Sequence, residues 1–184
     1  MIEHIIAYHC GPALAGIKPA NIVSCHKEKI PDLHREIERL NSQLNGKDIY
    51  LEILCECGKR ALVMVYKSKI LSAHLRDNEM KKLLKSFGYP ENSSLKIQLE
   101  QLKKRLKREN FPHEIGVFLG YPIHDIRGFM DHKDEGCLLT GEWKVYQNPE
   151  KAKALFRRYH MCRRAIVKRL AEGKTLAQVF CAVS

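Results

Sequence analysis

The sequence contains no apolar run close to the roughly 20 residues that a membrane-spanning helix requires. Its first residues, Met1-Ile2-Glu3-His4, lack the basic segment that begins a secretory signal peptide. The seven cysteines are an odd number at irregular spacings, which argues against a disulfide-stapled secreted domain. We therefore expect a soluble cytoplasmic protein with reduced cysteines and without a membrane partner.

Several spacings that mark common cofactor and catalytic sites are also missing. There is no Cys-x-x-Cys pair for structural zinc and no Cys-x-x-Cys-His for covalent haem attachment. The glycine patterns of nucleotide-binding loops and the Gly-x-Ser-x-Gly of hydrolases do not occur either. We therefore expect no resident metal, with transient contact to iron or haem through histidine or cysteine as an alternative.

The 184 residues are enough for one domain, over residues 1–184, with a substantial core. The net charge of +11 is unevenly distributed. Residues 1–66 carry 8 basic and 8 acidic side chains, whereas residues 67–184 carry 24 and 13. The basic character lies in the last two thirds of the chain, where it favours an anionic partner without bearing on the fold.

Hydrophobic periodicity and turn residues predict a mixed α+β fold. Apolar runs at residues 49–55 and 61–66 flank a glycine-containing turn, typical of a hairpin, and the second run is apolar throughout, as in an inner strand. Alternation at residues 138–146 predicts a further strand of the same small sheet. Helices should cover this sheet at residues 2–9, from Pro19, at 31–44, 69–75, 77–87 and 93–108, from Pro122, and at 149–171 and 175–182.

Glycine and proline predict where some of these elements end. Gly11-Pro12 should stop the first helix, and Gly46 should cap the helix at residues 31–44. Residues 114–120 fit either a strand or a helical turn, because periodicity does not separate the two at this length.

The segment from His9 to Asn21 concentrates reactive and polar side chains in backbone interrupted by two glycines and two prolines. Such residues favour a rigid loop, where binding and catalytic groups commonly lie. Lys18 and the free amides of a helix starting at Pro19 would attract a carboxylate or phosphate, with Asn21 as a second contact. The segment predicts a site for a small anionic ligand or a redox- or iron-related partner. The competing interpretation is that Lys18 is simply solvated and that Asn21 caps or bridges the backbone of the loop.

Two other functions are compatible with the sequence. Cys10 beside His9 offers a thiol and a base to a thiol-dependent enzyme, whereas a packed thiol is the structural alternative. Basic side chains on the helices at residues 93–108 and 149–171 suit a nucleic-acid backbone, whereas simple solvation is the alternative. The residues assigned to this nucleic-acid surface are Lys104, Arg108, Arg157, Arg164 and Lys168.

Aromatic side chains in the second half of the chain suggest a pocket wall. Tyr121, Trp143 and Tyr146 are the aromatic candidates, with His113 as a polar contact. Core packing is the competing role for Trp143, the only tryptophan. We assign His113, Tyr121 and Trp143 as candidate ligand-binding residues.

Three blocks of sequence resemble a bacterial family of domains of unknown function. They are His-Cys-Gly-Pro…Gly-Ile-Lys-Pro-Ala-Asn at residues 9–21, His-Glu-Ile-Gly-Val-Phe-Leu-Gly-Tyr-Pro at 113–122 and Gly-Glu-Trp-Lys-Val-Tyr at 141–146. The resemblance extends over nearly the whole chain and implies a link to accessory factors of iron uptake and flavodoxin function. It implies no particular activity, so whether the protein is an enzyme depends on its own residues.

Overall fold

The computed structural model describes residues 1–108 and 111–181, and it confirms the α+β class. A three-stranded antiparallel sheet consists of β1 (Ala20–His26), β2 (Ile49–Cys57) and β3 (Arg60–Lys67), in the order β1-β3-β2. The predicted hairpin is confirmed, and β3 is the inner strand of the sheet, between β1 and β2. Its apolar side chains are covered on both faces, with Val63, Met64 and Val65 fully buried.

The prediction for residues 138–146 is wrong in one respect, because this segment does not join the main sheet. It forms a separate hairpin of β4 (Leu139–Thr140) and β5 (Lys144–Val145). Trp143 and Val145 are buried there against Tyr159 of α8 (Pro149–Ala171). The alternating pattern therefore reflects packing of a short hairpin against a helix.

The third strand of the main sheet is β1, at the position predicted for a helix starting at Pro19. The β-branched pair Ile22 and Val23 favours extended backbone, and Asn21 lies opposite Val65 across the sheet. The helix prediction is wrong because the fixed φ of proline suits an extended segment as well as a first helical turn.

The first helix, α1 (Ile2–Leu14), continues through Gly11-Pro12, where the sequence predicts its end. Pro12 lacks a backbone donor, and the N–H of the next residue, Ala13, donates to Asn21 Oδ1 at 3.1 Å. The helix ends at Leu14, and two residues later Gly16, with a φ of +74°, accompanies the two backbone hydrogen bonds of a Schellman motif. Only residues 15–19 of the predicted rigid loop therefore lie outside regular structure.

The remaining helices lie close to their predicted ranges. They are α2 (Leu33–Leu44), α3 (Ser68–Leu75), α4 (Asn78–Ser86), α5 (Leu95–Leu106), α6 (Ile115–Phe118), α7 (Ile123–His132), α8 and α9 (Leu176–Phe180), with 3₁₀ turns η1 (Lys27–Lys29) and η2 (Asn45–Lys47). The ambiguous segment at 114–120 thus contains a helical turn, while residue 182, the predicted end of α9, lies outside the described residues. Gly46 does not cap α2, because the chain continues into η2 and Asp48 takes the left-handed conformation at φ +61°.

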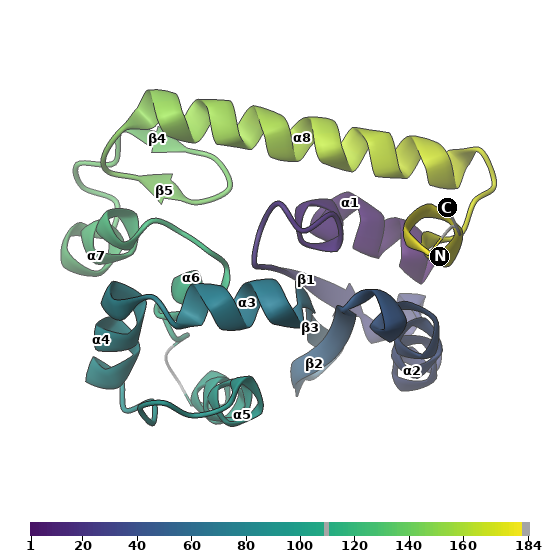
Figure 1. Ribbon diagram of the computed structural model, residues 1–184, viewed down its shortest axis with the longest axis horizontal. Helices are drawn as coiled ribbons and strands as arrows, with labels where there is room; N and C mark the ends of the chain where they lie inside the picture. The colour runs from purple at the N-terminus through teal and green to yellow at the C-terminus, as the bar shows by residue number, and fades with distance from the viewer. Residues whose placement is uncertain (109–110, 182–184) are drawn as a thin grey trace.

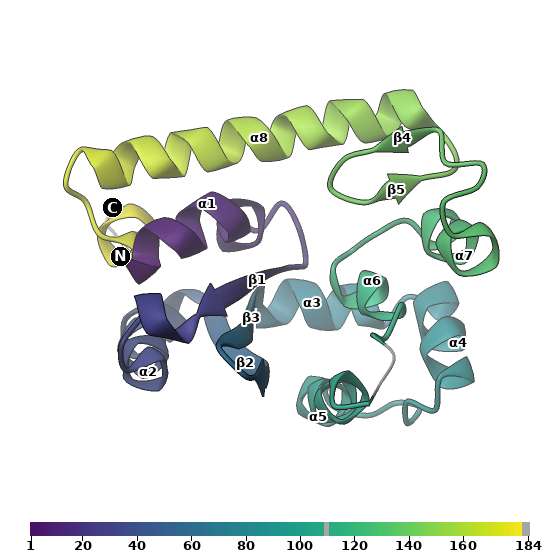
Figure 2. The same ribbon diagram turned by 180° about the vertical axis from the view of Figure 1, so that it is seen from behind.

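The helix α8 extends along one edge of the molecule, and α1 lies between α8 and the sheet (Figure 1 and Figure 2). One apolar cluster joins α1, α2, the sheet and the last turns of α8, and a second joins the sheet to α3–α7. In both views α5 lies at the edge opposite α8. In the part of the chain that the structure describes, no helix is both long and apolar enough to cross a bilayer.

Candidate functional site

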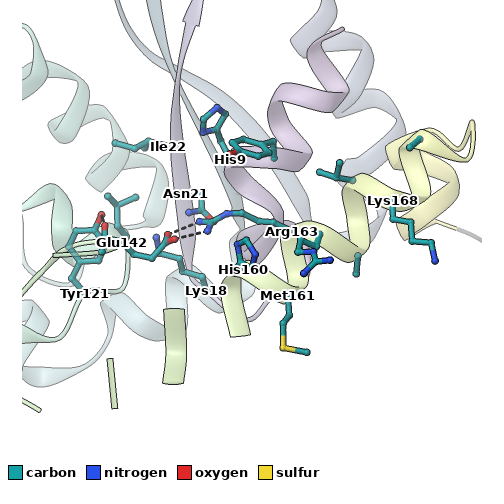
Figure 3. Close-up of a pocket in the computed structure, with 17 residues that line it drawn as sticks. His9, Lys18, Asn21, Ile22, Tyr121, Glu142, His160, Met161, Arg163 and Lys168 are labelled. Carbon is teal, nitrogen blue, oxygen red and sulfur yellow. Dashed lines mark hydrogen bonds and ion pairs between the residues drawn. The ribbon is translucent and has the colours of Figure 1, made fainter. Parts of the chain in front are cut away.

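A cleft of about 1000 Å³ lies between the end of α1, the start of β1 and the middle of α8 (Figure 3). Six residues that the sequence assigns to separate hypotheses line this cleft together: His9, Lys18, Asn21, Tyr121, Arg164 and Lys168. Two further charged lining residues, Glu142 and Arg163, were not predicted as site residues.

Lys18 is distinguished by a buried side chain whose ammonium group, at the cleft lining, has no ion-pair partner among the described residues. The residue is only 3% exposed, and its Nζ lies 5.2 Å from the ring centroid of Tyr121 and 5.7 Å from that of Tyr159. Both distances suit cation–π contacts, but no described residue accepts a hydrogen bond from Nζ. Burial lowers the pKa of Lys18 to about 8, although the carboxylate of Glu142 opposes this shift.

Asn21 combines a structural contact with a free donor. Its Oδ1 accepts the hydrogen bond from Ala13 that secures the end of α1 against β1. Its Nδ2 donates to no residue in the described ranges, and the side chain lines the cleft together with Lys18 and Arg163 (Figure 3). The amide group is therefore a neutral donor held in place by its own oxygen.

Glu142 and Arg163 form a two-pronged ion pair across the cleft. Nη1 and Nη2 of Arg163 donate to Oε1 and Oε2 of Glu142 at 2.5 and 2.6 Å. Burial alone would raise the pKa of Glu142, but the hydrogen bonds and charge of Arg163 outweigh it and hold that pKa below its usual value. The pair is neutral as a unit, so it leaves the charge of Lys18 uncompensated.

The other titratable residues of the cleft make it net positive. Arg164 and Lys168 are exposed on its outer part, so the lining has four basic side chains against one carboxylate. Burial and the nearby charge of Arg163 lower the pKa of His9 below its ordinary value of 6.5, so this imidazole adds less positive charge to the cleft than an unperturbed histidine would. The cleft thus favours anions through its lysines and arginines.

Tyr121 reaches the cleft because the residue before it, Gly120, packs closely against the ring of Pro19. Gly120 has a φ of +71°, and a Cβ at this position would lie 2.5 Å from Cδ of Pro19. Glycine alone fits this crossing. Since Tyr121 Oη also donates to the carbonyl oxygen of Glu142 at 3.2 Å, the blocks at residues 9–21, 113–122 and 141–146 meet here.

Cys10 lies outside the cleft. It is fully buried in the apolar cluster between α1 and the sheet, and burial raises the pKa of its thiol. A reactive cysteine needs an accessible, readily formed thiolate. The arrangement therefore favours the packing role for Cys10 over the catalytic one.

His113 and Trp143 line a second cavity of about 330 Å³, and Tyr121 is shared between the two cavities. Trp143 is 7% exposed, donates from Nε1 to Asp125 Oδ2 at 2.8 Å and packs against Phe156 at a centroid distance of 4.6 Å. Trp143 is thus both a core residue and a cavity wall.

The residues assigned to a nucleic-acid surface divide between two places. Arg157, Arg164 and Lys168 are exposed on α8. Lys104 lies on α5, and Arg108 is the second residue after its end; α5 lies at the edge of the molecule opposite α8 (Figure 1). The two groups therefore do not form one continuous surface.

The two missed residues differ in how far the sequence could have identified them. On a helical wheel of α8, Arg163 falls beside Leu170 at the margin of the apolar face, a position that indicates partial burial. Glu142 follows a glycine in a short loop, and nothing in the sequence separates it from a solvated turn residue. Within the described ranges, no three histidine, cysteine or acidic side chains gather closely enough to hold a metal ion.

Comparison with known proteins assigns the family. No curated protein and no solved structure matches the sequence. The model of the family described as "Protein of unknown function (DUF3793)" matches residues 6–180, which include every residue that lines the cleft. The chain therefore belongs to the DUF3793 family.

Proposed function

We propose that the cleft binds a small anion, with Lys18 as the main charged contact and Asn21 Nδ2 as a neutral donor. The support is the state of Lys18 itself. An ammonium group held largely out of water is costly unless a partner replaces the hydration that it has lost, and the carboxylate of Glu142 is already paired with Arg163. A bound anion would supply the missing partner and complete the site.

The position of Lys18 also favours a small ligand over a nucleic-acid backbone. Its ammonium group lies between the rings of Tyr121 and Tyr159, out of reach of a flat or convex surface. The exposed Arg164 and Lys168 lie nearer the solvent, where positive charge increases the local concentration of anions. In this proposal Arg164 and Lys168 attract the anion to the cleft, and Lys18 binds it.

Replacing Lys18 by methionine should weaken the binding of inorganic sulfate by about 10–100-fold, because a charge-assisted contact of about 1.5–3 kcal/mol is lost. Sulfate is a suitable probe because it remains a dianion over the pH range of folded proteins. The affinity is measured by isothermal titration calorimetry at low ionic strength. Lys104→Met, on the remote helix α5, removes the same charge and controls for the change in net charge.

The Lys18→Met variant should also unfold at a denaturant concentration no lower than that of the native protein, since it replaces a buried charge by an apolar chain of similar length. Loss of sulfate binding with stability retained would therefore identify Lys18 as a contact. Equal sulfate affinity in Lys18→Met and Lys104→Met would refute the proposed function.

The pKa of Lys18 predicts how binding depends on pH. The affinity for sulfate should be nearly constant below pH 7, fall about twofold by pH 8 and then approach a tenfold fall per pH unit, because the ammonium group loses its proton with a pKa of about 8. Stability should change in the opposite sense. Between pH 8 and 10.5 the unfolded chain keeps the lysine proton that the folded chain has released, so this group makes the folded state more favourable as pH rises. In Lys18→Met the fall in affinity should be absent, and the native protein should gain stability relative to this variant between pH 8 and 10.5. A fall in affinity that persists in the variant would assign the titration to another residue.

A further inference from the structure

The second cavity differs in chemistry from the cleft. Its walls are mostly apolar and aromatic, contributed by α6, α7 and the segment before β5. Ile115, Ile126 and Phe129 line it together with Trp143, and Phe111 at its rim is 53% exposed. Its volume of about 330 Å³ lies at the lower end of the range for small-molecule pockets.

The polar groups in this cavity are already paired. Both carboxylate oxygens of Asp125 accept hydrogen bonds, one from the indole of Trp143 and the other from the N–H groups of Tyr146 and Gln147. Lys144 forms an ion pair with Asp134. His113 lies exposed at the rim. The interior therefore has nothing to offer a polar group and suits an apolar one.

The cavity and the cleft are adjacent. Ile22, Leu119 and Tyr121 line both of them. The Tyr121 ring centroid is 5.2 Å from Nζ of Lys18 in the cleft and 4.9 Å from the ring centroid of Trp143 in the cavity. The shared wall that includes Tyr121 therefore lies between Lys18 and these apolar surroundings.

We propose that the ligand of this protein is an amphipathic organic anion, whose acidic group binds at Lys18 and whose apolar tail occupies the second cavity. This inference rests on the proposed function, since it needs the acidic group to bind in the cleft. It adds the chemical class of the remainder of the ligand. Charge complementarity assigns the acidic group of the ligand to Lys18. The pairing of the polar groups in the second cavity assigns the apolar tail to that cavity.

Straight-chain carboxylates from acetate to decanoate provide the test. Affinity should increase by up to about fourfold for each added methylene, until the chain fills the cavity. In a methyl-labelled sample, acetate should shift only the signals of cleft residues such as Val167, whereas octanoate should also shift those of Ile115 and Ile126. Trp143, the only tryptophan, should change its fluorescence with octanoate and not with acetate.

Each outcome separates the two proposals. Octanoate that shifts Ile115 and Ile126 in the native protein and loses affinity in Lys18→Met supports both. Octanoate that binds no more tightly than acetate, or leaves Ile115, Ile126 and Trp143 unchanged, overturns the amphipathic ligand while leaving anion binding intact. If neither sulfate nor any carboxylate binds in a Lys18-dependent way, the proposed function fails and the inference with it.

Discussion

Replacing Asp125 by alanine should lower the free energy of unfolding by about 3–5 kcal/mol, because three donors would lose one buried acceptor. Asp125 is 2% exposed on α7 and accepts hydrogen bonds from Trp143 Nε1 at 2.8 Å, Tyr146 N at 2.7 Å and Gln147 N at 3.2 Å. A single carboxylate thus holds the segment around β5 against α7. Equilibrium denaturation by urea, followed by the fluorescence of Trp143, measures the change.

Asp125→Asn is the matched control for this prediction. It preserves the shape of the side chain and the oxygen that can face Tyr146 and Gln147, but it places an amide N–H₂ opposite the indole donor or the backbone donors. Its free energy of unfolding should lie between those of the native protein and the alanine variant. A loss below about 1 kcal/mol for Asp125→Ala would show that solvent or a neighbouring acceptor replaces the carboxylate.

Asp125 also affects the candidate site. It holds Trp143, and Glu142 is the residue immediately before Trp143. Glu142 pairs with Arg163 and accepts the hydrogen bond of Tyr121 through its carbonyl oxygen. We therefore attribute to Asp125 a positioning role, through Trp143, for the wall that divides the cleft from the apolar cavity.

Replacing Arg105 by methionine should cost about 3–5 kcal/mol, because it leaves the buried carboxylate of Glu114 without its cation. Glu114 is fully buried, and its Oε1 accepts hydrogen bonds from Arg105 Nε and from Tyr89 Oη, the latter at 3.2 Å. Its Oε2 has no partner among the described residues. The guanidinium of Arg105 is partly exposed, at 19% for the side chain, so the lower end of this range is expected.

The double variant Arg105→Met with Glu114→Leu tests the cause of this loss. Because apolar side chains can replace a buried ion pair without destabilising the core, it should recover most of the stability lost in Arg105→Met. Urea denaturation of the native protein, both single variants and the double variant gives the coupling energy. If the two single losses simply add, the pair does not act as a unit.

Periodicity identified most of the elements because their apolar residues face one core. The stripe Leu33, Ile37, Leu40 and Leu44 is buried as α2 requires, and the continuous apolar run of β3 is covered on both faces. Predictions failed where one local signal suits two structures. Pro19 precedes a strand, and α1 passes through Pro12 because the neighbouring N–H finds its acceptor on Asn21, in the next element of the chain.

The candidate site shows the same division. From the sequence we could predict a site with Lys18 and Asn21 in the segment from His9 to Asn21, and an excess of basic charge later in the chain. Only the folded structure shows that Arg163 pairs with Glu142, that the buried Lys18 has no ion-pair partner among the described residues and that Cys10 belongs to the core. Burial and pairing are set by contacts between residues far apart in the chain, and these contacts exist only after α8 and the 141–146 segment have packed against α1 and β1.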